Sequence, residues 1–198
     1  AHITNVNCYD YSKLNATNTT INYVEIHSDG NFRFKNCTIG SIEVAWYADA
    51  VLTLLDSNVS SLWTWSDGWE NLTLIVKWSH ISALDLYGHS GLIAENSTLE
   101  NVRLGHNVSA EIYCTNSSYI GIWENSSLIV GFGCKISQLD IFYEVYGYVY
   151  ANGSSIFMEN VTKPSLQISG DAEIACLYKI FNLRGNAWGK FVNTSIHC

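Results

Sequence analysis

The sequence lacks most of the features that mark a nucleic-acid-binding protein or a membrane protein. It contains one proline, and its ten lysine and arginine residues are scattered singly among eighteen aspartate and glutamate residues, for a net charge of −8. This balance argues against nucleic acid as a partner. No apolar run approaches the roughly 18 residues of a membrane-spanning helix, so the sequence predicts no membrane span.

Metal and cofactor motifs are missing as well. The chain has no Cys-x-x-Cys pair and no His-x-x-x-His pair, which excludes a zinc ribbon. It shows neither a glycine-rich phosphate loop nor a Ser-His-Asp order. We therefore predict no catalytic residue, no metal site and no cofactor.

What the sequence does contain is a repeated set of three apolar positions, of which Leu99, Val102 and Leu104 are one copy. The last two have the period of a strand face, and the two-residue gap before them suits a corner. Successive sets begin 18, 20, 22, 18, 18 and 19 residues apart. The other sets are Ile21/Val24/Ile26, Ile39/Ile42/Val44, Val59/Leu62/Thr64, Ile81/Leu84/Leu86, Ser117/Ile120/Ile122 and Ile136/Leu139/Ile141.

A second apolar pair precedes each set after the first. The pairs are Phe32/Phe34, Leu52/Leu54, Leu72/Leu74, Leu92/Ala94, Ala110/Ile112 and Leu128/Val130. Two short strands in each repeat of about 20 residues predict coils that stack to close a continuous core. The predicted fold class is all-β, a single-stranded parallel β-helix with rungs of 18–22 residues and terminal caps. A leucine-rich repeat is disfavoured because no repeat contains Leu-x-x-Leu-x-Leu-x-x-Asn or leaves room for a helix.

The repeat divides the chain into three parts. Residues 1–20 do not show it and are predicted to form an N-terminal arm or cap, residues 21–168 form the repeats, and residues 169–198 form a C-terminal cap. A cap is expected because an open coil end is an unpaired sheet edge.

Acceptor triplets for N-glycosylation are unusually frequent. Nineteen asparagines and 34 serine plus threonine residues in 198 would give about three Asn-x-Ser/Thr triplets by chance, and twelve are present. We predict a secreted, densely glycosylated chain, although a β-solenoid that favours Asn, Ser and Thr at its turns is the alternative. The acceptors are Asn15, Asn18, Asn36, Asn58, Asn71, Asn96, Asn107, Asn116, Asn125, Asn152, Asn160 and Asn193.

The start of the chain and its cysteines also fit a secreted protein. The sequence begins at Ala1 in polar residues, as expected of a mature form whose export signal has been removed. Its six cysteines form an even set, as disulfides require. Cys114 and Cys134 precede the starts of adjacent sets by three and two residues, so we expect them about one strand spacing apart, roughly 4.8 Å, near disulfide reach. The other predicted pairs are Cys8–Cys37 and Cys176–Cys198.

The repeat architecture resembles the right-handed parallel β-helix of pectin-lyase-like proteins, over about residues 20–168. The resemblance is architectural, so it implies fold and little about function. A small, disulfide-tied and densely glycosylated solenoid also looks like secreted cell-surface proteins, including those that build archaeal envelopes and filaments.

Two columns of residues are predicted to face outward. The position between the last two apolar residues of each set gives Glu25, Glu43, Trp63, Asp85, Arg103, Gly121 and Asp140. A polysaccharide lyase would need clustered acidic residues for Ca²⁺ and a basic residue here, but Trp63 and Gly121 interrupt the column, which favours a solvated face. One residue further on lie His27, Ala45, Trp65, Tyr87, Gly105, Trp123 and Phe142, whose rings would stack on sugars, anchor an interface or lie under a loop.

Three segments lack N-glycosylation acceptors and are therefore the predicted contact surfaces. Residues 1–14, 128–151 and 163–192 carry none, and we expect contacts between copies there. The predicted interface residues are Ile3, Val6, Tyr9, Tyr146, Tyr148, Phe181 and Trp188. The predicted function is a secreted structural glycoprotein, not an enzyme, that assembles with copies of itself into a surface layer or filament. The alternative is a carbohydrate-active protein, either a lyase-like enzyme or a sugar-binding module.

Overall fold

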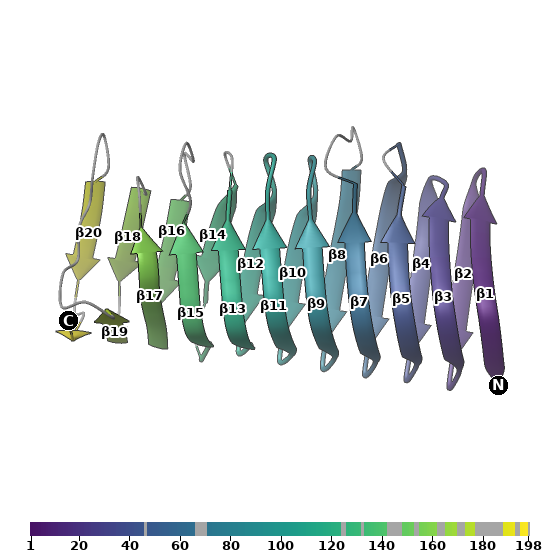
Figure 1. Ribbon diagram of the computed structural model, residues 1–198, viewed down its shortest axis with the longest axis horizontal. Helices are drawn as coiled ribbons and strands as arrows, with labels where there is room; N and C mark the ends of the chain where they lie inside the picture. Colours follow the sequence, from purple (N-terminus) through teal and green to yellow (C-terminus); the bar gives the residue numbers. More distant parts are fainter. Residues whose placement is uncertain are drawn as a thin grey trace.

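The computed structural model is a stack of coils, each made of two strands that run in opposite directions on two facing sheets (Figure 1). The structure describes residues 1–45, 47–65, 71–123, 126–131, 133–141, 148–152, 155–161, 165–169, 173–176, 188–192 and 195–197, with side chains described through residue 139. All strand pairs within each sheet are parallel, and no helix occurs in these residues. The predicted all-β parallel β-helix is confirmed.

Sheet A has 11 strands and sheet B has 10, and each sheet takes every second strand of the chain. Sheet A contains β1 (His2–Tyr9), β3 (Thr20–His27), β5 (Thr38–Val44), β7 (Asn58–Thr64), β9 (His80–Leu86), β11 (Thr98–Leu104), β13 (Asn116–Ile122), β15 (Lys135–Ile141), β17 (Ser155–Val161), β19 (Glu173–Cys176) and β21 (Ser195–His197). Sheet B contains β2 (Ser12–Thr17), β4 (Gly30–Lys35), β6 (Asp49–Leu55), β8 (Asn71–Lys77), β10 (Gly91–Glu95), β12 (Ser109–Tyr113), β14 (Ser127–Val130), β16 (Tyr148–Asn152), β18 (Ser165–Ser169) and β20 (Trp188–Val192).

The three-position apolar set is the inward face of each sheet A strand. Leu99, Val102 and Leu104 pair with Ile81, Leu84 and Leu86, as the repeat predicts. All six side chains are buried in one continuous core. Parallel pairing stacks equivalent residues directly. Each inward column therefore gains one apolar side chain per rung, and the core extends by a full coil.

The second apolar pair lies on the inward face of sheet B, with one correction. Phe32 and Phe34 pair with Leu52 and Leu54 as predicted. On β8, however, the partners of Leu52 and Leu54 are Leu74 and Val76, so the predicted pair Leu72/Leu74 is displaced by two residues. The strand has three inward residues, and a period of two alone does not say which two continue the column.

The lower corner in Figure 1, between each sheet B strand and the next sheet A strand, has a constant structure. Its first residue has a left-handed backbone, with φ between 47° and 53° at the non-glycine positions. These positions are Asn18, Asn36, Asp56, Trp78, Asn96 and Cys114, followed in the next coil by Gly133. Asparagine, aspartate and glycine tolerate this conformation best, which explains their frequency here.

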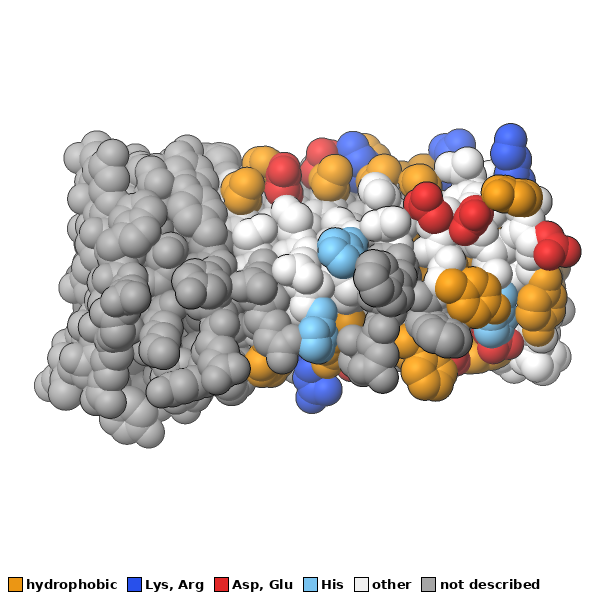
Figure 2. All heavy atoms as spheres, turned by 90° about the horizontal axis from the view of Figure 1, so that it is seen from above, with side chains coloured by type: hydrophobic (Ala, Val, Ile, Leu, Met, Phe, Trp, Pro, Cys, Tyr) orange, Lys and Arg blue, Asp and Glu red, His pale blue; other side chains and the backbone are white. Residues whose placement is uncertain are grey.

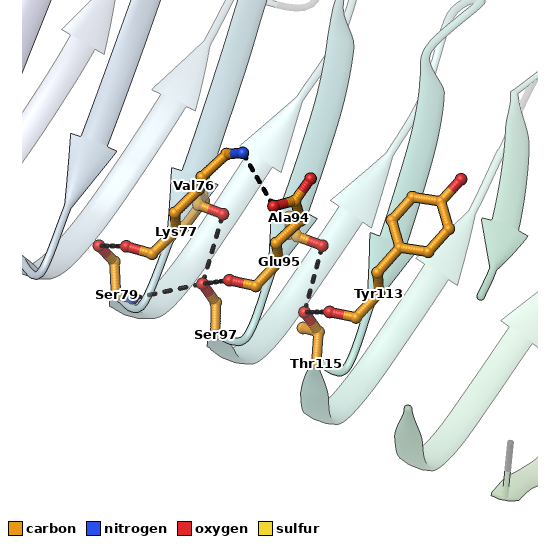
Figure 3. Close-up of polar contacts among 8 residues, drawn as sticks. All are labelled: Val76, Lys77, Ser79, Ala94, Glu95, Ser97, Tyr113 and Thr115. Atoms are coloured by element: carbon orange, nitrogen blue, oxygen red, sulfur yellow. Dashed lines mark hydrogen bonds and ion pairs between the residues drawn. The ribbon is translucent and has the colours of Figure 1, made fainter. Parts of the chain in front are cut away.

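The next residue at this corner points into the core and is always small and polar. The buried members are Cys37, Ser57, Ser79, Ser97, Thr115 and Cys134, which we call the corner ladder. The Ser79 hydroxyl accepts the Ser57 N–H at 3.0 Å. In the next coil the Ser97 hydroxyl accepts the Ser79 N–H at 3.3 Å (Figure 3). The ladder therefore satisfies backbone groups that the turn would otherwise bury without partners.

Residues 1–20, set apart above as an arm or cap, contain β1 and β2 and form a coil of the same solenoid. Ile3, Val6 and Cys8 pair with the first recognised set, Ile21, Val24 and Ile26. The repeat was missed because a cysteine stands at its third position. At the other end, β19, β20 and β21 continue the two sheets through residues 173–197, within the segment predicted to be a cap.

Candidate functional site

The predicted outward column exists on sheet A. Strand pairing joins Glu25 to Glu43, Glu43 to Trp63, and Trp63 to Asp85. It then joins Asp85 to Arg103, Arg103 to Gly121, and Gly121 to Asp140. Alternation therefore predicted the strand register of the whole column and the outward side chains from Glu25 to Arg103, whereas Gly121 is buried beside Tyr119 and Trp123 and the side chain of Asp140 is not described.

The carboxylates of this column do not converge on a common point. The Arg103 guanidinium lies 3.7 Å from the Asp85 carboxylate, and both side chains are partly exposed. Burial raises the pKa of Asp85, and Arg103 opposes that rise. Among the residues with described side chains, no group of three His, Cys, Asp or Glu could hold a metal ion. The column thus offers isolated polar contacts.

Glu43 is held by two aromatic donors. The Tyr23 hydroxyl donates to one carboxylate oxygen, and Trp65 Nε1 donates to the other at 2.9 Å. Burial and the bond to Glu43 raise the pKa of Tyr23. Glu43 therefore fixes the orientation of the Trp65 ring at the upper corner, between sheet A and sheet B.

A group of exposed rings lies at the upper corner of the N-terminal coils. This aromatic strip consists of Tyr9, His27, Tyr47 and Trp65, of which Tyr9, Tyr47 and Trp65 are 57%, 56% and 53% exposed. The Tyr9 and His27 rings are stacked, with centroids 5.1 Å apart and planes 10° apart. Figure 2, which looks down on this corner, shows a histidine between hydrophobic side chains, with acidic side chains nearby.

The polar atoms of the strip are connected through His27. Its Nε2 lies 2.6 Å from a Glu25 oxygen, and its Nδ1 lies 3.0 Å from the Tyr47 hydroxyl. Because a carboxylate only accepts, Nε2 carries the proton of the contact with Glu25. Rings from three successive coils and the Glu25 carboxylate are thereby held in one row.

The sequence predicted part of this strip. His27 and Trp65 are in the predicted aromatic column, whereas Ala45 is buried, and Phe142 lies outside the described residues. A Cβ at Gly105 would lie 2.9 Å from the Tyr87 ring, so that glycine makes room for the ring beside it. Tyr9 was predicted as an interface residue but not as part of the aromatic column, because the first coil was not recognised.

The acceptor asparagines with described side chains all lie on the surface. They are Asn15, Asn18, Asn36, Asn58, Asn71, Asn96, Asn107 and Asn116. Asn18, Asn36 and Asn96 occupy the left-handed corner position, and the Asn36 amide donates to the Asn18 side-chain oxygen at 2.6 Å. Turn geometry therefore gives these three asparagines a structural role of their own. Asn125 and Asn193 lie outside the described residues, and the side chains of Asn152 and Asn160 are not described.

The four cysteines with described side chains are free thiols, so the predicted pairs Cys8–Cys37 and Cys114–Cys134 are not formed. Cys8 pairs with Ile26 near the end of β3, whereas Cys37 precedes Thr38, the partner of the first residue of β3. They are thus about 20 Å apart along the strands.

Cys114 and Cys134 do lie at one corner, but their side chains point in opposite directions. Cys114 is exposed, and its Sγ lies 3.2 Å from the Cβ position of Gly133. Cys134 is buried, and its Sγ donates to the Ile112 carbonyl at 3.3 Å as part of the corner ladder. The third predicted pair involves Cys198, which lies outside the described residues, and Cys176, which ends β19.

Of the predicted interface residues, the structure describes the side chains of some, only the backbone of others, and nothing of the rest. Ile3 is 38% exposed, Tyr9 belongs to the aromatic strip, and Val6 is half-buried against the core. Tyr148 and Trp188 begin β16 and β20, of which only the backbone is described. Tyr146 and Phe181 lie outside the described residues.

No family model, characterised protein or solved structure matches this chain. In the part of the chain that the structure describes, no helix is long and apolar enough to cross a membrane.

Proposed function

We propose that this protein is a structural glycoprotein of the cell surface or extracellular space that assembles with copies of itself into a layer or filament. Its covalent partners in this proposal are N-linked glycans, and its assembly partners are further copies of the same chain. An enzyme receives less support, because Glu25, Glu43 and Asp85 are each engaged by different neighbours: His27 for Glu25, Tyr23 and Trp65 for Glu43, and Arg103 for Asp85.

The observation that carries this proposal is the edge formed by β1 and β2. These are the first strands of the two sheets, and each pairs with one described neighbour, as do β21 and β20 at the other end (Figure 1). The inward residues of this coil are also less covered than those of later coils: Ile3 is exposed, and Val6 and Leu14 are half-buried. A long, regular edge with an apolar lining favours pairing with another chain.

Two lysines at this edge are expected to abolish assembly. Ile3→Lys with Val6→Lys places charge on the apolar lining, where the open side lets each side chain reach water, so the solenoid stays folded. The matched control is Asn5→Lys with Asn7→Lys on the outward side of the same strand. Negative-stain electron microscopy and sedimentation compare both with the wild-type chain.

Substitution is a sharper test here than deletion. Removing residues 1–7 would take away most of β1 and expose Ile21 and Val24 on β3 as a new apolar edge. A wild-type chain that stays monomeric at high concentration would contradict end-to-end assembly, and so would a lysine variant that assembles as well as its control.

Glycosylation is tested by intact mass. If most of the twelve acceptors are occupied, the native protein exceeds the 22.1 kDa of the chain by the mass of several glycans. Enzymatic or chemical removal of the sugars should return the mass to that of the polypeptide. A native mass equal to the bare chain would overturn the glycoprotein part of the proposal and leave turn geometry as the explanation of the triplets.

The aromatic strip supports a second candidate function, a sugar-binding module. Tyr47 and Trp65, on the two coils that follow the stacked Tyr9–His27 pair, are each more than half exposed, and exposed aromatic rings suit stacking on pyranose faces. Glu25 and Glu43 beside the rings supply acceptors for sugar hydroxyls. The net charge of −8 favours a neutral polysaccharide over an acidic one.

Affinity electrophoresis in gels that contain soluble xylan or β-glucan tests this candidate. We expect Trp65→Ala to lose the retardation shown by the wild-type chain. Trp78→Ala is the matched control, since Trp78 is 59% exposed and lies at the opposite corner. Equal mobility of the wild-type chain with and without polysaccharide would exclude this candidate for those sugars.

A further inference from the structure

The outer face of sheet B is apolar along its centre. Its central column is built by strand pairing of Arg33 with Thr53, Thr53 with Ile75, Ile75 with Ile93, and Ile93 with Glu111. Val51 and Leu55 flank Thr53 on β6. Ile93 is 36% exposed, and the others in this group of apolar side chains are half-buried. Parallel sheets are usually covered on both faces, and this one presents isoleucines to solvent.

Charges of opposite sign stand at the two ends of this column. Towards the N-terminal coils lie Lys13, Arg33 and Lys35, and towards the C-terminal coils lie Glu95 and Glu111. Between them Lys77 binds Glu95 at 2.8 Å. The upper margin of Figure 2 shows the same order, with basic side chains over the N-terminal coils and acidic ones beyond a hydrophobic stretch.

The charges are fixed by their neighbours. The Tyr113 hydroxyl donates to Glu111 at 3.0 Å, and this hydrogen bond raises the pKa of Tyr113. Glu111 is therefore held as an acceptor near the surface of β12. On β4, Arg33 projects from the centre of a strand whose neighbouring residues Phe32 and Phe34 point inward and anchor it.

We propose that the outer face of sheet B binds the same face of a second copy of this chain. The two copies are related by a two-fold axis parallel to the strands that passes by Ile75. Rotation about that axis reverses the order of the coils, so it places β4 opposite β12 and β6 opposite β10. Arg33 then faces Glu111 and Thr53 faces Ile93, each pair being made twice, and Ile75 meets Ile75 once on the axis.

Charge complementarity selects this arrangement. A two-fold axis along the solenoid would place each coil opposite itself and bring Arg33 against Arg33, which is repulsive. The chosen axis instead buries the apolar centre between two Arg33–Glu111 pairs, with the sheets about 10 Å apart. Lys77 on the central strand then faces its own copy, but each Lys77 is already paired with the Glu95 carboxylate of its own chain.

The size of the outer face of sheet B sets the expected affinity of the dimer. The outer strands of the five that take part are about 19 Å apart at 4.8 Å per strand, which places this contact at the small end of specific interfaces. We therefore expect a weak dimer whose stability falls with added salt. Of the acceptor asparagines with described side chains, Asn15 on β2 is the outward neighbour of Arg33, just outside the five strands. Asn71 is exposed at the first position of β8 and faces its own copy across the axis, so this contact requires that Asn71 carries no glycan.

Charge reversal tests the contact. Sedimentation equilibrium of the wild-type chain is expected to show a concentration-dependent dimer. Arg33→Glu and Glu111→Arg should each raise the dissociation constant about tenfold or more, because each puts like charges together at two places. The double variant R33E/E111R restores opposite charges and is expected to recover the dimer. Lys135→Glu, an exposed reversal on sheet A, is the control and should leave dimerisation unchanged.

The outcomes separate this inference from end-to-end assembly. A chain that dimerises with Ile3→Lys and Val6→Lys in place but not with Arg33→Glu supports the lateral contact and leaves the edge proposal to its own test. A wild-type chain that remains monomeric at all concentrations, or a double variant as weak as the single ones, would overturn the inference.

Discussion

Replacing Val102 with aspartate is expected to prevent the chain from folding. Val102 is 1% exposed and lies in the core between Leu84 of the preceding coil and Ile120 of the next one. The change removes a buried side chain worth about 1.5–3 kcal/mol. It also buries a carboxylate without a partner, which costs several kcal/mol more. Together these two terms approach the free energy of unfolding of a typical domain, which is about 5–15 kcal/mol.

The adjacent residue provides the control. Arg103 points outward from the same strand, and Arg103→Asp introduces the same carboxylate into solvent. We expect that variant to give the β-type circular dichroism spectrum of the wild-type chain and a slightly lower melting temperature, because the new carboxylate faces Asp85 across the strand pair. A Val102→Asp chain that melts like the wild-type protein would contradict the assignment of Val102 to the core.

The core could be predicted because burial imposes a strict pattern on a solenoid. A parallel rung stacks each residue on its equivalent one coil away, so Leu84 and Val102 must both be apolar for the core to continue. The pattern fails where a residue type other than the usual aliphatic ones fills a core position. Cys8 is buried like the isoleucine that it pairs with, Ile26, yet its residue type does not mark it as part of an apolar set.

Side-chain direction at the corners could not be predicted from spacing. Cys114 and Cys134 are correctly assigned to the same corner, but one takes the left-handed position and points out, and the other takes the next position and points in. A one-residue difference at a turn reverses the direction of a side chain, just as it does on a strand. Spacing therefore predicted proximity without predicting a bond.

The surface was predictable only to the level of columns. The outward column from Glu25 to Asp140 follows from alternation alone. The hydrogen bonds of this column, such as those of Glu43 with Tyr23 and Trp65, join neighbouring coils and depend on how each corner is folded. The same is true of Tyr47, which joins the aromatic strip from a corner of variable length.

The corner ladder leads to a second large effect. Ser97 donates to the Glu95 carbonyl at 2.8 Å and accepts the Ser79 N–H at 3.3 Å (Figure 3). Its hydroxyl also lies 3.4 Å from the Val76 carbonyl of the preceding coil. One small side chain therefore satisfies a donor and an acceptor in two adjacent coils, inside a part of the core that water does not reach.

Substituting Ser97 with valine is expected to lower the free energy of unfolding by about 1–3 kcal/mol, since the buried Ser79 N–H loses its acceptor, while the Glu95 carbonyl keeps the Trp78 N–H as a partner. Ser97→Thr is the matched control, because threonine has the shape of valine and keeps the hydroxyl. Thr115 occupies the equivalent position one coil further on, where it donates to the Tyr113 carbonyl at 2.9 Å, so a side chain of this size fits the corner. The threonine variant should therefore cost about 1 kcal/mol or less. Urea denaturation followed by circular dichroism measures both changes. If valine and threonine destabilise the chain equally, the cost is one of volume, and the hydrogen bonds of the ladder contribute nothing measurable to stability.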